Sequence, residues 1–555
     1  MTRSTGRDAF LSILADEGVT HVFGNPGTTE LAIMEALGEQ EKLRFVLGLQ
    51  ESIVLAMADG YARASGRITA CNVHVAPGLG NAMGALYSAA FCRSPVIVTA
   101  GQQEQGHGLQ EPLLYGPLVE MARPLAKWAI EVTRAEDLPR ILRRAAKIAT
   151  TPPCGPVFIS LPGDVLDASV EIDFGRSTRV ERATRPSDEA IERLARRLLA
   201  AERPVIIAGT ELATYSAWTE AVALAELLGA PVHQQSVPDA AHFPSDHPAY
   251  MGTLSRDQKK VNATLAAHDL AVWLGGDALR MSVYSPVEPL PAGLPVVHIT
   301  EADWDLGKNF AAEFALHANV KDTLAALLPK LRAMQSPAQA AAARARLAAF
   351  EPENWSARRA RLAAEFEKNA GATPIDPRLL MKRIADAVPA NAIVVEEALT
   401  ATPPLLQMLR YRDPQGFMGM ASGGIGFAVP GAVGASFGAP GRPVVAVVGD
   451  GSAMYSIQAL WTAANAKLPV TWAIVNNSSY RILKERMVSF RGKRSFGGMD
   501  MRQPAIDFVA LAQSLGVKAV RISDPKDIDG AMREATAAGE PRLVDFSVQD
   551  GFGGG

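Results

Sequence analysis

Short apolar runs alternate with stretches of helical periodicity along most of this chain. In the last third, residues 444–448 and 470–475 are β-branched runs that are too short for helices and are bounded by Gly, Pro or Asn. Residues 456–466, between them, carry apolar side chains at helical spacing. The pattern therefore predicts two buried parallel strands joined by a helix.

The same rhythm recurs in three parts of the chain and predicts an α/β fold of three doubly wound parallel-sheet domains. We expect a first domain at 1–165, a central domain at 187–335, a charged helical linker at 336–374 and a third domain at 375–555. A variable connector around 171–186 separates the first two domains. The expected strands are 20–23, 43–49, 68–74, 95–100 and 157–161 in the first domain, 204–208, 270–274 and 295–299 in the central domain, and 393–395, 444–448 and 470–475 in the third.

Composition narrows the class of protein. The 555 residues are 48% hydrophobic and carry a net charge of -3, so nothing global favours binding to nucleic acid or to a membrane surface. No apolar run approaches the ~18 residues that a membrane span needs. The amino-terminal residues resemble neither a signal nor a transit peptide, and the three cysteines have no metal-binding spacing. We therefore expect an ordinary soluble globular protein of the cytoplasm.

Polar residues follow both strands of the unit described first. The first strand ends on Gly449-Asp450-Gly451, and the second ends on Asn476-Asn477. Both tips lie at the carboxyl edge of one sheet, where open α/β folds bind ligands. The carboxylate of Asp450 and the amide oxygen of Asn477 suit Mg²⁺. The two glycines admit an anion, and the helix that opens near Ser452 presents free N–H groups to it. The predicted ligand is a metal-bound diphosphate.

This arrangement resembles a known family. A Gly-Asp-Gly followed about two dozen residues later by Asn-Asn is similar to the thiamine diphosphate signature. The run GDGSAMYSIQALWTAA at 449–464 resembles the 2-oxo acid decarboxylases, which include benzoylformate decarboxylase and the acetohydroxyacid synthases. The resemblance implies thiamine diphosphate and Mg²⁺ as cofactors, with Ser479 as a third metal ligand and Tyr480 as a cofactor contact. The alternative is a turn in an ordinary strand-helix-strand unit.

The resemblance also implies which residues act on the cofactor. Glu51 matches the family's catalytic glutamate, and the alternative for it is a first-turn helix glutamate. Ile425 matches the residue that bends the cofactor, and the alternative is a plain core isoleucine. Gly423 matches the carbonyl that holds the cofactor's 4'-amino group. Thr400 is a candidate hydroxyl for the diphosphate, or else a helix cap.

Four residues are candidates on the substrate side. Thr28, in Asn25-Pro26-Gly27-Thr28, aligns with a serine that binds the substrate carboxylate in relatives. His74 aligns with an active-site histidine and is a candidate for proton transfer, the alternative being a structural histidine. Ile482 and Arg486 fall where relatives form the substrate pocket; either Arg486 recognises a second anionic group or it lies on a solvated basic helix face. The family's second active-site histidine has no counterpart in 276–289.

Partners and function follow from the resemblance. Glu51 and Asp450 lie in different domains, which in this family come from different subunits, so a homodimer or a dimer of dimers is implied. The expected reaction is non-oxidative decarboxylation of a 2-oxo acid to an aldehyde and CO₂. The first alternative is a carboligase, in which the activated substrate attacks a second carbonyl, and a remote one is a non-catalytic cofactor-binding protein.

Two glycine-rich stretches leave further alternatives. Gly209 and Gly275-Gly276 follow strands of the central domain and leave nucleotide binding open there. Gly78-Leu79-Gly80 lacks the third glycine of a dinucleotide fingerprint, so we expect a tight turn.

Overall fold

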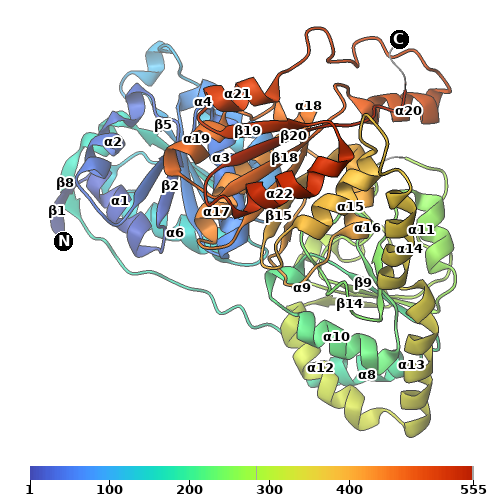
Figure 1. Cartoon of the computed structure of the whole chain (residues 1–555). Helices are drawn as coiled ribbons and strands as arrows, with labels where there is room; N and C mark the ends of the chain where they lie inside the picture. The colour runs from blue at the N-terminus through green and yellow to red at the C-terminus, as the bar shows by residue number, and fades with distance from the viewer. Residues whose placement is uncertain (283, 553–555) are drawn as a thin grey trace.

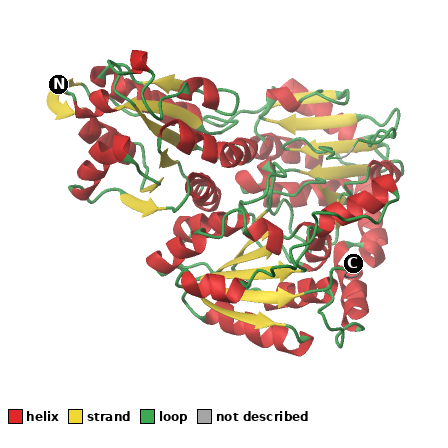
Figure 2. Cartoon of the chain, turned by 90° about the horizontal axis from the view of Figure 1, so that it is seen from above, coloured by secondary structure: helices red, strands yellow, loops and turns green. Residues whose placement is uncertain are grey.

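The computed structural model describes residues 1–282 and 284–552, in which three six-stranded parallel sheets are covered by helices (Figures 1 and 2). This confirms the predicted fold class. The strands of each sheet come from one of the three predicted domains. We propose the same domain limits, 1–165, 187–335 and 375–555. No helix of the described residues is long and apolar enough to cross a bilayer.

The first sheet has the strand order β3-β2-β4-β5-β7-β6. Its strands are β2 (His21–Gly24), β3 (Arg44–Leu47), β4 (Thr69–Val73), β5 (Val96–Gln102), β6 (Ala129–Glu131) and β7 (Val157–Pro162). Its helices are α1 (Gly6–Asp16), α2 (Leu31–Gly38), α3 (Glu51–Ser65), α4 (Val75–Phe91), α5 (Leu118–Ala122), α6 (Leu138–Thr150) and α7 (Gly163–Asp167). A small antiparallel ribbon of β1 (Thr2–Thr5) and β8 (Ser169–Ile172) closes this domain.

The central sheet has the order β11-β10-β9-β12-β13-β14 and is reached by an extended connector that Figure 1 shows as a long loop. Its strands are β9 (Pro204–Ala208), β10 (Val232–Gln234), β11 (Tyr250–Thr253), β12 (Leu270–Leu274), β13 (Val296–Thr300) and β14 (Phe314–His317). Its helices are α8 (Asp188–Leu199), α9 (Glu211–Thr214), α10 (Trp218–Leu228), α11 (Gln258–Leu265) and α12 (Val320–Met334). The expected linker forms α13 (Pro337–Phe350) and α14 (Trp355–Glu367).

The third sheet has the order β16-β15-β17-β18-β20-β19. Its strands are β15 (Ile393–Glu397), β16 (Phe417–Met418), β17 (Val444–Gly449), β18 (Val470–Asn476), β19 (Lys518–Ile522) and β20 (Arg542–Ser547). Its helices are α15 (Pro377–Ala387), α16 (Thr402–Met408), α17 (Ala428–Gly438), α18 (Asp450–Ala453), α19 (Ala459–Ala466), α20 (Arg481–Arg491), α21 (Phe508–Ser514) and α22 (Ile528–Ala537).

Three details differ from the sequence expectations. The turn expected at Gly78-Leu79-Gly80 is wrong, because these residues lie inside α4, which begins at Val75 directly after its cap, His74. The helix expected at 456–466 begins only at Ala459, after the separate turn of α18. Strand β15 continues through Glu397, whose side chain is fully buried.

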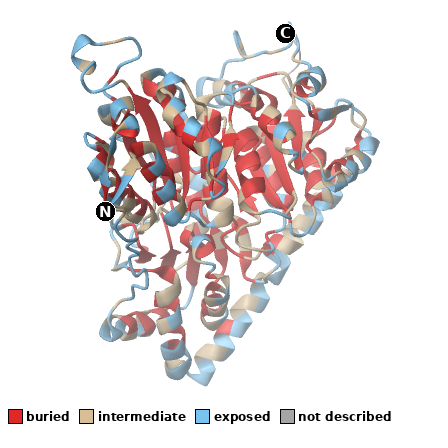
Figure 3. Cartoon of the chain, turned by 90° about the vertical axis from the view of Figure 1, so that its left-hand side faces the viewer, coloured by how far each residue is buried: buried red, intermediate tan, exposed pale blue. Residues whose placement is uncertain are grey.

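Close contact between α3 and α17 joins the first and third domains. A β-carbon on Gly60 would lie 2.2 Å from the carbonyl oxygen of Gly431, and one on Gly434 would lie 1.9 Å from that of Met57. Only glycine admits backbones this near to one another. The two domains consequently share one hydrophobic core, and Figure 3 shows buried residues concentrated on the strands and the inner helices.

Arg63 on α3 ties all three domains together. Its guanidinium donates hydrogen bonds to the carbonyl oxygens of Asp239 in the central domain, at 2.6 Å, and of Gly419 in the third domain, at 3.1 Å. It also lies 4.9 Å from the ring centre of Phe427. These half-buried, directional contacts help to fix the mutual orientation of the domains.

Candidate functional site

Asp450 and Asn477 lie at the carboxyl ends of the adjacent parallel strands β17 and β18. Asp450 is 4% exposed, and its Oδ1 accepts a hydrogen bond of 2.8 Å from the backbone N–H of Gly451. Asp450 Oδ2 and Asn477 Oδ1 are buried and have no hydrogen-bond partner among the described residues. Two buried oxygen acceptors that lack a partner among the described residues, at one sheet edge, indicate a ligand-binding position.

Burial also disfavours the charge on Asp450. It raises the pKa of this carboxyl to about 6, although backbone N–H groups of Gly451 and of 477–479 act in the opposite direction. A cation beside the carboxylate would compensate this desolvation.

The donor set fits Mg²⁺ in kind. One carboxylate and one amide oxygen, with backbone carbonyls and diphosphate oxygens, are the hard oxygen ligands that this ion prefers. In the described part of the chain no group of three or more His, Cys, Asp or Glu side chains is arranged around a metal position. A site that takes one carboxylate from the protein and the rest from other oxygens does not require such a group.

The segment that follows β18, at Ser479 and Tyr480, pairs with the segment at Met499 and Asp500. The N–H of Tyr480 donates to the carbonyl oxygen of Met499 at 2.8 Å, and Ser479 forms a bridge with Asp500. The ring of Tyr480 packs against Gly451, where a β-carbon would come within 2.7 Å of it. Gly451 is therefore required by the packing as well as by the proposed anion site. Ser452, the next residue, is buried, and its hydroxyl has no partner among the described residues.

A loop from the same domain carries Gly423 and Ile425. Glu397, at the end of β15, accepts hydrogen bonds from the N–H groups of Gly426 at 2.5 Å and Ala428 at 2.6 Å. Burial raises the pKa of Glu397 to about 7, against the effect of these N–H donors. Gly423 is exposed with a φ of +77°, and Ile425 is half-buried. Ile425 is thus not a plain core residue, and Glu397 fixes the loop that presents it.

Thr400 follows Glu397 by three residues and lies in a single turn of 3-10 helix, Leu399–Ala401. The cap alternative for Thr400 is wrong, because the cap residue of α16 is Ala401 and no side-chain hydrogen bond caps that helix. Thr400 is half-buried.

Glu51 is the first residue of α3. Its carboxylate accepts a hydrogen bond of 3.1 Å from Asn81 on α4, and a β-carbon on Gly78 would lie 3.0 Å from its Oε1. The helix is capped instead by Gln50, whose side chain accepts from the N–H of Ser52 at 2.7 Å. The carboxylate of Glu51 is therefore free of the capping role and is partly exposed beside α4.

His74 caps α4 and is held by Glu30. Its Nδ1 lies 2.7 Å from Glu30 Oε2, and the hydroxyl of Thr29 lies 3.2 Å from the same nitrogen. Glu30 is fully buried and also accepts from the N–H groups of Gly27 and Gly101, at 2.8 Å each. The carboxylate therefore fixes His74 and the preceding loop together.

Gly27 gives the loop its close approach to His74. A β-carbon on Gly27 would lie 2.2 Å from the imidazole, so the loop requires glycine at this position. Thr28, the next residue, is exposed at the start of a 3-10 turn. The structure thus places the hydroxyl of Thr28 and the imidazole of His74 at the same edge of the first sheet.

Helix α20 carries the other substrate-side candidates. Ile482 is half-buried, whereas Arg486 is exposed, with its guanidinium 5.4 Å from the ring centre of Phe490. The buried cation of this helix is Lys484, which pairs with Asp500 at 2.7 Å and Asp550 at 2.8 Å. Lys484 anchors the helix, and Arg486 is free to meet a ligand or solvent.

Sequence reasoning missed Glu30, Glu397 and Lys484 as residues that position the site. Glu30 stands third after Gly27, where a glutamate can bind back to the start of a helical turn, so this spacing offered a signal. Glu397 and Lys484 act through contacts distant in sequence and left no local signal.

Three parts of the chain match domain models of one protein family. Three family models match: "Thiamine pyrophosphate enzyme, N-terminal TPP binding domain" at residues 4–113, the central domain of the same family at 191–327, and its C-terminal TPP binding domain at 402–546. Together they cover the central sheet and most strands of the first and third sheets. The chain belongs to the thiamine pyrophosphate enzyme family.

The relatives include decarboxylases and synthases. The chain is 33% identical over 553 residues to a benzoylformate decarboxylase of Pseudomonas aeruginosa, covering 98% of this chain and 99% of that protein. It is 28% identical over 567 residues to a probable acetolactate synthase large subunit of Methanocaldococcus jannaschii, covering 98% and 92%. The structure of a thiamine diphosphate-dependent 4-hydroxybenzoylformate decarboxylase of Rhodococcus jostii RHA1 matches with a TM-score of 0.87 and 32% identity, covering 98% and 99%.

Proposed function

We propose that this protein is a thiamine diphosphate- and Mg²⁺-dependent lyase that converts a 2-oxo acid to an aldehyde and CO₂. The observation that carries the proposal is the pair of buried oxygens on Asp450 and Asn477, at adjacent strand ends, that have no hydrogen-bond partner among the described residues. Full-length similarity to decarboxylases supports the same reaction class.

The third domain would hold the diphosphate and the metal. Asp450, Asn477 and the backbone at Ser479 would supply metal ligands, and the N–H groups around Gly449–Ser452 would bind the anion. Thr400 and Gly423 lie on segments of the same domain. Ile425 offers the half-buried apolar surface that would support a bent cofactor. When bound, thiamine diphosphate supplies the electron sink for loss of the carboxylate.

The first domain would supply the proton-transfer groups. Glu51, which accepts a hydrogen bond from Asn81, would exchange a proton with a bound heterocycle. His74, held by the buried carboxylate of Glu30, would move a proton during product formation. The hydroxyl of Thr28 would donate to the substrate carboxylate. Ile482 and Arg486 would select the substrate side chain, with Arg486 favouring a second anionic group.

A second copy of the chain would complete the site. Glu51 makes its side-chain hydrogen bond within the first domain, and Asp450 makes its own within the third. Large apolar side chains are exposed near the first-domain groups, among them Leu31 at 63% and Leu49 at 41%. We propose a homodimer or a dimer of dimers in which these surfaces are covered.

The direct test is a screen of 2-oxo acids with the purified protein, in which CO₂ and aldehyde are measured with and without thiamine diphosphate and Mg²⁺. The proposal predicts stoichiometric CO₂ and aldehyde that depend on both cofactors. No turnover of any 2-oxo acid, with the cofactor bound, would favour a non-catalytic binding protein.

A carboligase is the second candidate. It is favoured by the similarity to acetolactate synthases and by the absence of histidine from 276–289. A missing proton donor would leave more time for attack on a second carbonyl. Acyloin in place of aldehyde, at equal CO₂ release, would identify this activity.

A further inference from the structure

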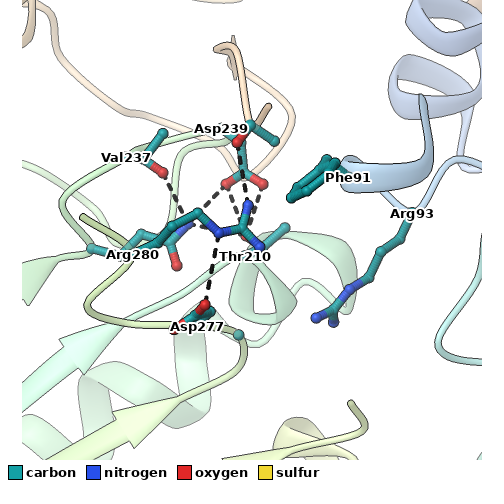
Figure 4. Close-up of a pocket in the computed structure, with 10 residues that line it drawn as sticks. Phe91, Arg93, Thr210, Val237, Asp239, Asp277 and Arg280 are labelled. Atoms are coloured by element: carbon teal, nitrogen blue, oxygen red, sulfur yellow. Dashed lines mark hydrogen bonds and ion pairs between the residues drawn. The ribbon is translucent and has the colours of Figure 1, made fainter. Parts of the chain in front are cut away.

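The cavity where the three domains meet is too small for an organic ligand (Figure 4). Its volume is about 40 Å³, which is room for about three water molecules, and Arg280 in its wall pairs with Asp277 at 3.7 Å. A different cluster of charged side chains, around Lys484 on α20, lies beside the segment that we propose to bind the metal.

Helix α20 is held by a cation and not by an apolar stripe. Of its 11 described residues, Lys484 alone is buried, with a side chain that is 1% exposed, whereas Leu483 and Phe490 are exposed. A helix on the surface of a domain normally packs through an apolar face. A buried ammonium is retained only where it is paired with carboxylates. The position of α20 therefore depends on the partners of Lys484.

The partners of Lys484 come from segments that are far apart in the sequence. Its Nζ donates to Asp500 Oδ1 at 2.7 Å and to Asp550 Oδ2 at 2.8 Å. Asp550 is itself buried, and the same oxygen accepts from Arg502 at 2.8 Å. The ammonium thus joins three pieces of chain: the start of α20, the loop around Asp500 and the C-terminal segment 548–552.

The loop around Asp500 is paired with the segment that follows β18. The N–H of Tyr480 donates to the carbonyl oxygen of Met499 at 2.8 Å. The N–H of Met501 donates to the carbonyl oxygen of Ser478, also at 2.8 Å. A displacement of this loop would therefore move the backbone on which a metal ligand is proposed.

The C-terminal segment is fixed on both sides of Asp550. Before it, the N–H of Val548 donates to the carbonyl oxygen of Asn476, the last residue of β18, at 2.9 Å. The carbonyl oxygen of Gln549 accepts from the guanidinium of Arg481 at 3.1 Å. The carboxylate that holds the lysine is consequently presented from a segment anchored to the same strand end.

We propose that Lys484 is a positioning residue that links the cofactor end of the active site to its substrate end. Through Asp500 the lysine holds the segment of the proposed metal ligands. As part of α20 it sets the place of Ile482 and Arg486, the substrate-side residues. Asp550 fixes the lysine between these two groups. The inference rests on the proposed function, because that function assigns the two groups to a metal and to a substrate.

The test measures two properties of the purified protein. One is the affinity for thiamine diphosphate in the presence of Mg²⁺, by calorimetry, and the other is backbone hydrogen exchange over residues 478–502. Lys484→Met should weaken cofactor binding about tenfold or more and speed exchange in that range. Lys484→Arg, which keeps the charge, should recover most of the lost affinity. Asp550→Asn should change both properties in the same direction as Lys484→Met.

Kinetics add a measurement that a general loss of stability would not reproduce. With a 2-oxo acid from the screen, Lys484→Met should raise KM about fivefold or more, because α20 carries the substrate-side residues. At saturating cofactor kcat should fall by less than KM rises, since the lysine acts through its neighbours and not on the reacting atoms.

Lys382→Met is the matched control. Lys382 belongs to the same domain and also lies between two carboxylates, 2.6 Å from Glu367 and 3.0 Å from Asp386, where it ties α14 to α15. These helices carry none of the residues assigned to the cofactor or the substrate. The control variant should therefore keep the wild-type cofactor affinity and the wild-type exchange over 478–502.

Each outcome decides the proposal. Weaker cofactor binding in Lys484→Met, rescued by Lys484→Arg and absent from Lys382→Met, supports it. Equal losses in Lys484→Met and Lys382→Met, or unchanged affinity and exchange in Lys484→Met, overturn it. If Lys484→Met does not fold, Asp550→Asn decides in its place, and wild-type behaviour of that variant overturns the proposal.

Failure of the proposed function is a separate result. A wild-type protein that binds no thiamine diphosphate would contradict that function. Hydrogen exchange over 478–502 needs neither cofactor nor turnover, so it still judges the role of Lys484: faster exchange in Lys484→Met supports the positioning role, and unchanged exchange overturns it.

Discussion

The imidazole Nδ1 of His74 lies 2.7 Å from the carboxylate of Glu30, a buried residue that also binds two backbone N–H groups. This one carboxylate fixes the first-domain loop and the proposed proton-transfer group at once. Its replacement therefore probes both structure and catalysis.

Glu30→Gln is predicted to lower kcat about 10- to 100-fold and the free energy of unfolding by about 1–3 kcal/mol, because an amide cannot accept from all of these donors. If Glu30 acts through His74, adding Glu30→Gln to His74→Ala should lower kcat little further. Steady-state kinetics of the two single variants and the double variant measure this. Fully additive losses would contradict the positioning role.

Gly434→Ala is predicted to destabilise the protein by about 2–4 kcal/mol, because its β-carbon would lie 1.9 Å from the carbonyl oxygen of Met57. Gly530→Ala is the control, since that helical glycine has nothing within 4 Å of the added carbon. It should be neutral or stabilising by up to about 1 kcal/mol. Thermal or urea unfolding separates the two, and equal stability of both variants would argue against the α3–α17 contact.

Glu397 predicts a pH dependence of stability. Its folded-state pKa of about 7 lies above the ordinary carboxyl value of 4.5, so the folded protein holds the proton more tightly than the unfolded chain. Stability from this group is fully present below pH 4.5 and is lost as the pH rises towards 7. Relative to Glu397→Gln, the wild type should lose up to roughly 3 kcal/mol between pH 5 and 8. Urea unfolding of both proteins measures the difference, and parallel pH profiles would contradict it.

Asp450→Asn is predicted to weaken thiamine diphosphate binding in the presence of Mg²⁺ by more than about tenfold, because the proposed metal ligand loses its charge. Chelation of Mg²⁺ should release the cofactor from the wild type in the same way. Asp527→Asn, at an exposed carboxylate, is the control. The measurement is cofactor affinity by fluorescence or calorimetry. Unaltered affinity after both the substitution and the chelation would contradict the proposed metal site.

Much of the fold could be predicted because central strands of parallel sheets are continuous apolar runs. Strands β9 and β12 were expected at the residues where they occur. Strands β10, β11 and β14 were missed, because they are short, carry polar or half-exposed positions and lie away from the sheet centre. Their existence depends on pairing with distant neighbours, which periodicity does not reveal.

In the candidate site, too, some residues could be predicted from the sequence and others could not. Asp450 and Asn477 could be found because a turn motif and its spacing fix them within one strand-helix-strand unit. The supporting residues could not, because Glu30 meets Gly101 and Glu397 meets Gly426 only after the chain has folded. The helix start at Val75 was missed because His74 caps it without the side-chain hydrogen bond that marks most such caps.

The central claim is that Glu51 of one subunit and Asp450 of another hold one cofactor. Mixed dimers of Glu51→Gln and Asp450→Ala subunits test it most directly, by CO₂ release from the best 2-oxo acid of the screen. Each variant alone should be nearly inactive, whereas the mixed dimer contains one intact site of two and should recover up to about half of the wild-type activity. Mixed dimers as inactive as their parents would show that both residues must come from the same chain and would contradict the account.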